Sequence, residues 1–295
     1  ESNQKLVLHY DIETHTDNPE HEHLPYIVGY THYDFEKKKW VYGTFEGDDC
    51  MDLFYDYVRY CPKIRYLNAY NGNRFDHFYL SKLAINDCNN LKSKICVNSG
   101  SILKLTIPKL IESKTITDKE NEKEYTTFPD LITCDLCRHL DGSLKDNLIN
   151  NNCQVSKGEI DHNISTYWSD TDEERRQEVR EYLKCDVLGL RELYEKFDNE
   201  SFKDHGTNLC DYLTGSMLCY DLWRTKYLNE VVELPDAETD TFMRKAIYGG
   251  RCYPNKKSFI SKSYQDIING KINFDDIKDL VPQAFHQLFF YINLG

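Results

Sequence analysis

The sequence predicts a mixed α/β fold. Three observations lead to this prediction: apolar, strand-like segments alternate with segments of helical periodicity, acidic residues follow the ends of strands, and the chain can bury a sizeable core. It has 295 residues and a mass of 34.9 kDa. Because 40% of its residues are hydrophobic and 13% aromatic, a wholly disordered protein is excluded.

The first half of the chain predicts strands with helices between them. β-branched and aromatic residues alternate with polar ones where strands are expected, and apolar residues recur at helical spacing elsewhere. In chain order, the predicted elements are strands at 5–12 and 26–33, a helix at 52–60, a strand at 64–70, a helix at 76–83 and two hairpin arms at 101–107 and 124–134. A charged segment at 112–123 joins the hairpin arms, and we expect it to be exposed.

The second half predicts helices followed by a basic tail. Residues 171–197 have the periodicity of a long amphipathic helix, and residues 208–228 predict a further one. We therefore expect a first domain at 1–200, a helical connector at 201–240 and a last segment at 241–295.

The charge is uneven along the chain. The net charge is −13, which by itself argues against a polyanionic partner. Residues 241–295, however, carry eight Lys or Arg against four Asp or Glu. Between residues 241 and 265, aromatic residues alternate with Lys and Arg, and no Asp or Glu occurs. This pattern is typical of a surface that follows a phosphate backbone. An ordinary solvated surface is the alternative explanation of this tail.

Composition also bears on class and compartment. No apolar run is long enough to cross a bilayer, and residues 1–30 lack the layout of a secretory signal. The 11 cysteines are odd in number and scattered, so we expect reduced thiols in an intracellular compartment. The chain begins with Glu1, so we expect a processed product or a part of a longer chain.

Four acidic residues carry the chemical signal: Asp11 and Glu13 in Asp-Ile-Glu-Thr, Asp76 in Asn-Gly-Asn-Arg-Phe-Asp, and Asp186 in Tyr-Leu-Lys-Cys-Asp. Alternation along a strand places Asp11 and Glu13 on one face. Two neighbouring carboxylates repel each other unless a cation neutralises them, and hard Mg²⁺ or Mn²⁺ prefers such oxygens. Tyr182 precedes Asp186 by four residues, so the two share a helical face.

The order and spacing of these motifs resemble the three motifs of the 3′–5′ exonuclease domain of family B DNA polymerases, which has an RNase H-like (DnaQ-type) fold. Lys157-Gly158-Glu159-Ile160 resembles a Lys-x2-hydrophobic motif of the protein-primed branch. Together these motifs favour that branch over other family B polymerases.

The resemblance implies a role for each matching residue. Asp11, Glu13, Asp76 and Asp186 would bind two Mg²⁺ or Mn²⁺ ions, Tyr182 would position the attacking water, and Lys157 would contact the scissile phosphate. The 3′ end of single-stranded DNA would be held by Thr14, Asn71 and Phe75, the last by stacking, together with Ser143 and Leu144. The last pair fits its motif less well, because Asn147 occupies a hydrophobic position.

The resemblance continues into the tail. Ile247-Tyr248-Gly249-Gly250 resembles the Tyr-x-Gly-Gly motif that contacts DNA between nuclease and palm, and Arg251 follows it. The segment from Asp276 to Pro282 resembles the first palm motif, which would make Asp276 a residual polymerase metal ligand. Asp279 and Val281 replace the Ser and Tyr of that motif. No second acidic palm motif occurs, so we expect no polymerisation by this chain alone.

Two alternatives to an active nuclease stay open. The chain is either a degenerate, polymerase-derived subunit of a larger complex or one fragment of a complete polymerase, with a terminal protein or a further polymerase subunit as partner. Each motif taken singly also has an ordinary explanation as surface charge or core packing. Frequent Asn, Lys and Tyr suggest an AT-rich genome, which fits a virus, a linear plasmid or an organelle such as the mitochondrion.

Overall fold

The computed structural model describes residues 3–15, 23–61, 63–87, 94–111, 114–118, 123–127, 129–156, 158, 168–229 and 235–246. The chain divides into two compact units, Glu1–Asn229 and Glu230–Gly295. The predicted division at residues 200 and 240 stays a prediction. In the described part, no helix has the length and apolar character needed to cross a bilayer.

A seven-stranded mixed sheet forms the centre of the first unit, in the order β3-β2-β1-β4-β9-β6-β5. Its strands are β1 (Val7–His15), β2 (Leu24–Asp34), β3 (Lys39–Glu46), β4 (Tyr66–Ala69), β5 (Lys94–Asn98), β6 (Ser101–Pro108) and β9 (Asp130–Asp135). The three central strands β1, β4 and β9 are parallel, whereas the outer pairs are antiparallel. The carboxyl ends of β1, β4 and β9 therefore meet at one edge of the sheet.

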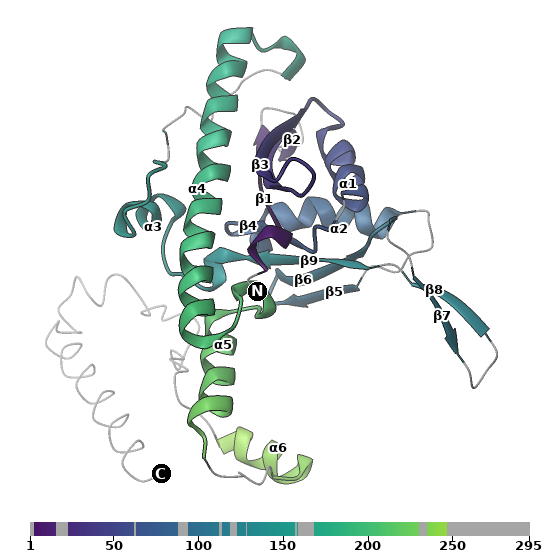
Figure 1. Ribbon diagram of the computed structural model, residues 1–295, viewed down its shortest axis with the longest axis vertical. Helices are drawn as coiled ribbons and strands as arrows, with labels where there is room; N and C mark the ends of the chain where they lie inside the picture. Colours follow the sequence, from purple (N-terminus) through teal and green to yellow (C-terminus); the bar gives the residue numbers. More distant parts are fainter. Residues whose placement is uncertain are drawn as a thin grey trace, which may run out of the picture. The chain divides into compact units, whose positions relative to one another are not determined.

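Helices cover both faces of this sheet (Figure 1). Helices α1 (Cys50–Tyr60) and α2 (Asp76–Asn86) pack on one face, and the long α4 (Glu173–His205) packs on the other. The described part of the unit also contains the shorter α-helices α3 (Leu144–Asn150) and α5 (Gly215–Leu222), the latter followed by a π-helical turn, Trp223–Tyr227. The second unit contains α6 (Ala237–Ala246).

Alternation along β1 decides which residues face which helices. Leu8, Tyr10 and Ile12 belong to the core shared with α1 and α2. Val7 instead belongs to the core shared with α3 and α4. Because side chains alternate between the faces of a strand, Asp11 and Glu13 lie on the α4 side, as Val7 does.

The predicted α/β fold is confirmed, with local corrections. The arm predicted at 124–134 is not one strand, because β8 (Lys123–Thr127) pairs with β7 (Lys114–Asp118) and β9 begins only after Pro129. Proline has no N–H for a strand ladder. The helix predicted at 171–197 continues to His205, where Gly206 ends it with a left-handed φ of 73°. The helix predicted at 208–228 begins only at Gly215, after the Thr214 cap.

A buried ion pair fastens α1 to the segment after α2. Arg59 is 2% exposed, and its Nη1 lies 2.7 Å from Oδ2 of Asp87, whose side chain is 6% exposed. The Arg59 Nε donates to the carbonyl oxygen of Pro108 at 3.2 Å, and its guanidinium lies 5.1 Å from the centre of the Tyr55 ring. One side chain thus connects α1, the end of β6 and the segment after α2.

Candidate metal centre

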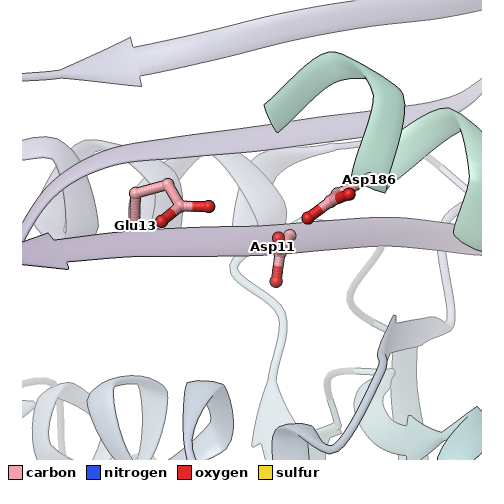
Figure 2. A group of neighbouring side chains, drawn as sticks. All are labelled: Asp11, Glu13 and Asp186. Atoms are coloured by element: carbon pink, nitrogen blue, oxygen red, sulfur yellow. The ribbon is translucent and has the colours of Figure 1, made fainter. Parts of the chain in front are cut away.

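Three of the predicted carboxylates converge where α4 crosses β1. One carboxylate oxygen from each of Asp11, Glu13 and Asp186 lies within 4.8 Å of the other two. Figure 2 shows Asp11 and Glu13 on the same strand, with Asp186 reaching toward them from the helix. Asp186 is buried, and the other two are partly exposed. We call these three residues the carboxylate trio.

A glycine on the neighbouring strand lets α4 approach the sheet at this point. Gly29 of β2 pairs with Asp11 across the ladder. A Cβ atom at Gly29 would lie 2.8 Å from Cγ of Leu183, closer than side-chain atoms normally approach. Leu183 lies on α4, three residues before Asp186. The absence of a side chain at Gly29 therefore allows the helix to bring Asp186 to the strand.

Asp76, the fourth predicted carboxylate, begins α2 and is not a member of the trio. It is 2% exposed, and its Oδ1 has no hydrogen-bond partner among the described residues. Burial raises the pKa of Asp76 well above its usual value, and the negative charges of Asp11, Asp135 and Glu13 add to this rise. Asp76 therefore shares the electrostatic environment of the trio.

This donor set fits a divalent cation. Carboxylates held within 4.8 Å repel one another, roughly by a few kcal/mol for each charged pair in a partly buried site. A buried carboxylate oxygen without a hydrogen-bond partner, as in Asp76, is costly unless a cation or proton satisfies it. Oxygen-only ligands are the preference of hard cations such as Mg²⁺. The trio, with Asp76 beside it, can hold such an ion.

Asp135 organises the loop that leads to Asp76, and sequence reasoning missed it. It ends β9, directly beside the end of the parallel strand β4. Its Oδ1 accepts from the backbone N–H groups of Asn71 at 2.8 Å and Cys137 at 3.0 Å, and its Oδ2 accepts from that of Asn73 at 3.1 Å. Burial raises the pKa of Asp135, and the three N–H donors oppose that rise.

The loop itself follows a restricted path. Asn71 has a left-handed φ of 62°. A Cβ at Gly72 would lie 2.7 Å both from Cβ of Ala69 and from Cε1 of His77, so the next position requires glycine. The buried His77 ring bridges Tyr10, whose hydroxyl lies 2.7 Å from Nδ1, and the Cys134 carbonyl oxygen, 3.2 Å from Nε2. Since a carbonyl only accepts, Nε2 donates and Nδ1 accepts.

We expect Asp135→Asn to destabilise the protein by about 1–3 kcal/mol, because an amide NH₂ would face a backbone N–H and leave it unsatisfied. Urea denaturation measures the change in the free energy of unfolding. Asp130→Asn is the matched control, since Asp130 is exposed at the start of the same strand. Equal stability of the two variants would contradict the assigned role of Asp135.

Aromatic residues gather around Phe75, the residue directly before Asp76. The ring of Phe75 meets His23 edge-on, with centroids 5.6 Å apart, and meets Tyr79 edge-on at 5.5 Å. Nδ1 of His23 lies 3.2 Å from Oγ1 of Thr14, and the Tyr79 hydroxyl donates to the His23 carbonyl oxygen at 2.9 Å. The predicted DNA-binding residues Thr14 and Phe75 are thus joined through His23, which no sequence motif indicated.

Comparison with known proteins establishes the family. The family described as DNA polymerase type B, organellar and viral, matches residues 59–268, more than half of the chain. The chain belongs to this family. This confirms the predicted resemblance to family B DNA polymerases. Among curated proteins, none matches the chain significantly.

Solved structures of phi29 DNA polymerase share the fold of this type B family member. A complex with primer-template DNA and incoming nucleotides matches with a TM-score of 0.59 and 18% identity, covering 85% of this chain and 40% of that chain. A complex with single-stranded DNA matches with a TM-score of 0.56 and 18% identity, covering 85% and 41%. The chain therefore spans about two fifths of the length of these polymerases.

Tyr182 and Lys157 are the other predicted residues of the nuclease motifs. Tyr182 lies on α4, one turn before Asp186, and is 8% exposed. A Cβ built on Gly158 would lie 3.6 Å from Cδ2 of Tyr182, so the residue that follows Lys157 lies beside the phenol ring. Lys157 itself lies outside the described residues.

Ser143 and Leu144 have structural roles in this type B chain. The Ser143 hydroxyl caps α3 by accepting from the Asp146 N–H at 3.1 Å, and Leu144 is 8% exposed in the core shared with α4. Asn147, at the position expected to be hydrophobic, donates to the Tyr70 hydroxyl at 2.9 Å. Contact of Ser143 and Leu144 with DNA stays a prediction.

The tail predictions fall on residues whose placement is not described. Gly249, Gly250, Arg251 and Asp276 all lie outside the described residues. Their roles in DNA contact and in residual metal binding stay predictions from the sequence.

Proposed function

We propose that the first unit is a metal-dependent 3′–5′ exonuclease that removes nucleotides from the 3′ ends of single-stranded DNA, as the proofreading part of a protein-primed type B polymerase. The observation that carries the proposal is the trio of Asp11, Glu13 and Asp186 within 4.8 Å. Membership in the type B family and the fold shared with phi29 DNA polymerase support it.

Asp11, Glu13 and Asp186, with Asp76 beside them, would hold two Mg²⁺ or Mn²⁺ ions. Two such ions stabilise the attacking and leaving oxygens of an in-line phosphoryl displacement. The negative side chains keep their positions because strand β1, helix α4 and the Asp135-anchored loop fix the backbone at each. The site is therefore organised before substrate arrives, which reduces the cost of reaching the reactive geometry.

The remaining residues act on the strand and on water. Phe75 would stack on a base near the 3′ end, since every base offers a π-face and the His23 and Tyr79 rings hold Phe75 in place. Thr14 and Asn71 would donate hydrogen bonds to the same nucleotides, and Lys157 would contact the scissile phosphate. Tyr182, one helical turn from Asp186, would orient the attacking water through its hydroxyl.

A labelled single strand tests the proposal. With Mg²⁺ or Mn²⁺, a 5′-labelled oligonucleotide should shorten stepwise from its 3′ end, while circular single-stranded DNA stays intact. An uncut linear strand, or equal cutting of the circle, overturns the proposal. A folded protein that cuts neither would instead favour the alternative of a structural subunit, and co-purification would then identify a terminal protein or polymerase subunit as its partner.

Tyr182→Phe removes only the hydroxyl that we assign to water positioning. We expect the rate of cleavage to fall roughly 10²-fold, the lower end of the usual contribution of a positioned proton-transfer or water-orienting group, with little change in the affinity for the strand. Single-turnover kinetics measures the two separately. Tyr194→Phe is the matched control, because Tyr194 is a buried tyrosine on the same helix and lies in the core. Equal rates for the two variants would refute the role of Tyr182.

A further inference from the structure

A polar hollow of about 360 Å³ lies beside the loop that carries Asp76. Asn71, Asn73 and Asp135 contribute to its lining from the carboxyl ends of β4 and β9. Two arginines, Arg74 and Arg138, contribute positive charge, and the hydroxyl residues Ser101, Thr214 and Ser216 also line it. None of the sequence motifs assigns a function to these two arginines.

The two guanidinium groups are available to an anion. Neither Arg74 nor Arg138 forms an ion pair with a carboxylate in the described part of the chain. The Nε of Arg138 donates to the amide oxygen of Asn73 at 2.9 Å, in the amide orientation in which the Asn73 nitrogen also donates to the Ile102 carbonyl oxygen at 2.7 Å. This bond fixes Arg138. Its other N–H groups form no hydrogen bond with a carboxylate among the described residues.

The one carboxylate in the lining does not cancel this arrangement. Both oxygens of Asp135 accept backbone N–H bonds, from Asn71, Cys137 and Asn73, and the side chain is 4% exposed. Asp135 therefore holds the floor of the hollow, whereas Arg74 is exposed at its rim. The lining thus contains two guanidinium groups and one carboxylate, on a protein whose overall charge is −13.

We propose that this hollow binds the phosphodiester backbone of the single strand on the 5′ side of the nucleotide at the trio. The inference rests on the proposed function and deepens it. Arg74 directly precedes Phe75 and Asp76, so a strand whose last base stacks on Phe75 lies within reach of the hollow that Arg74 lines. Guanidinium groups pair well with phosphate oxygens, and amides and hydroxyls supply further neutral donors.

Such a site answers an electrostatic difficulty of the trio. Even with two divalent ions bound, the trio and Asp76 carry no net positive charge, so the attraction of a polyanion needs further cations nearby. Arg74 and Arg138 provide two such cations in the described lining of the hollow. Each phosphate that they neutralise releases counterions from the strand. The affinity for the strand should therefore depend on salt through these two residues.

The salt dependence of binding tests the proposal. Fluorescence anisotropy with a labelled single-stranded oligonucleotide is measured over a range of NaCl concentrations in the Asp11→Ala/Glu13→Ala background, which does not cleave. For two phosphate contacts, Arg74→Ala/Arg138→Ala should reduce the slope of log K against log[NaCl] by about 1.4, and Arg74→Ala alone by about 0.7. At low salt we expect the double variant to bind at least tenfold more weakly.

The controls make each outcome decisive. Lys37→Ala removes an exposed cation from the turn between β2 and β3, at the opposite edge of the sheet, and should leave the slope unchanged. Arg74→Lys/Arg138→Lys keeps the charge and should keep most of the slope. The proposal is overturned if the double alanine variant matches Lys37→Ala, or if affinity falls without a change in slope. Cleavage by the unmodified protein is measured separately. Failure of the nuclease proposal can therefore be distinguished from failure of the proposed phosphate site.

Discussion

Asp11→Ala combined with Glu13→Ala should abolish cleavage of single-stranded DNA, with a loss of more than about 10³-fold, while the protein stays folded. Removing two of the three oxygens that lie within 4.8 Å leaves too few ligands for a stable divalent site. The fold should survive, because the two side chains are partly exposed and their mutual repulsion disappears. The cleavage assay measures the first effect, and thermal unfolding with and without Mn²⁺ measures folding and metal binding.

We expect Mn²⁺ to raise the melting temperature of the unmodified protein and to leave that of the double variant unchanged, since a ligand stabilises only the state that binds it. Asp52→Ala/Asp56→Ala is the matched control, because both acids are exposed on α1. This control should keep both the cleavage and the Mn²⁺ response. Cleavage by the double variant at the control's rate would show that the trio is not the centre.

Arg59→Ala should lower the free energy of unfolding by about 3–5 kcal/mol, the usual effect of removing one partner of a buried ion pair. The change leaves the 6%-exposed carboxylate of Asp87 buried without its cation and removes the bond to the Pro108 carbonyl. It also leaves a cavity beside Tyr55. Urea denaturation measures the loss, and Asp87→Asn provides a milder version of it if Arg59→Ala does not fold.

A double-mutant cycle separates the pair from the cavity. Arg59→Ala combined with Asp87→Ala should be less destabilised than the sum of the two single changes, because no uncompensated charge remains. Arg224→Ala serves as the surface control, since that pair with Asp221 is largely exposed and should change stability by less than about 1 kcal/mol. Strict additivity, or a loss no larger than that of Arg224→Ala, would contradict the role given to Arg59.

The trio could be predicted from sequence because it depends on two local periodicities. Strand alternation places Asp11 and Glu13 on one face, and the helical spacing of Tyr182 and Asp186 places both on one side of α4. The family resemblance then supplied what periodicity cannot, namely that this helix crosses this strand. Asp76 was predicted beside them for the same reason, and the structure places it buried next to the trio rather than within it.

The features missed by sequence reasoning depend on which strands are neighbours. Asp135 reaches Asn71 and Asn73 only because β9 lies parallel to β4, a pairing between segments far apart in the chain. An acid directly after a buried strand was nevertheless visible in Cys-Asp at 134–135, and the same logic that selected Asp11 applied to it. His23 offered no such signal, because its partners lie on other elements.

A crystal structure of the protein soaked with Mn²⁺ tests the central claim most directly. The account predicts anomalous density for Mn²⁺ within coordination distance of Asp11, Glu13 and Asp186, and none there in crystals of the Asp11→Ala/Glu13→Ala variant. Absence of density at the three carboxylates of the unmodified protein, at Mn²⁺ concentrations that saturate its thermal shift, would contradict it.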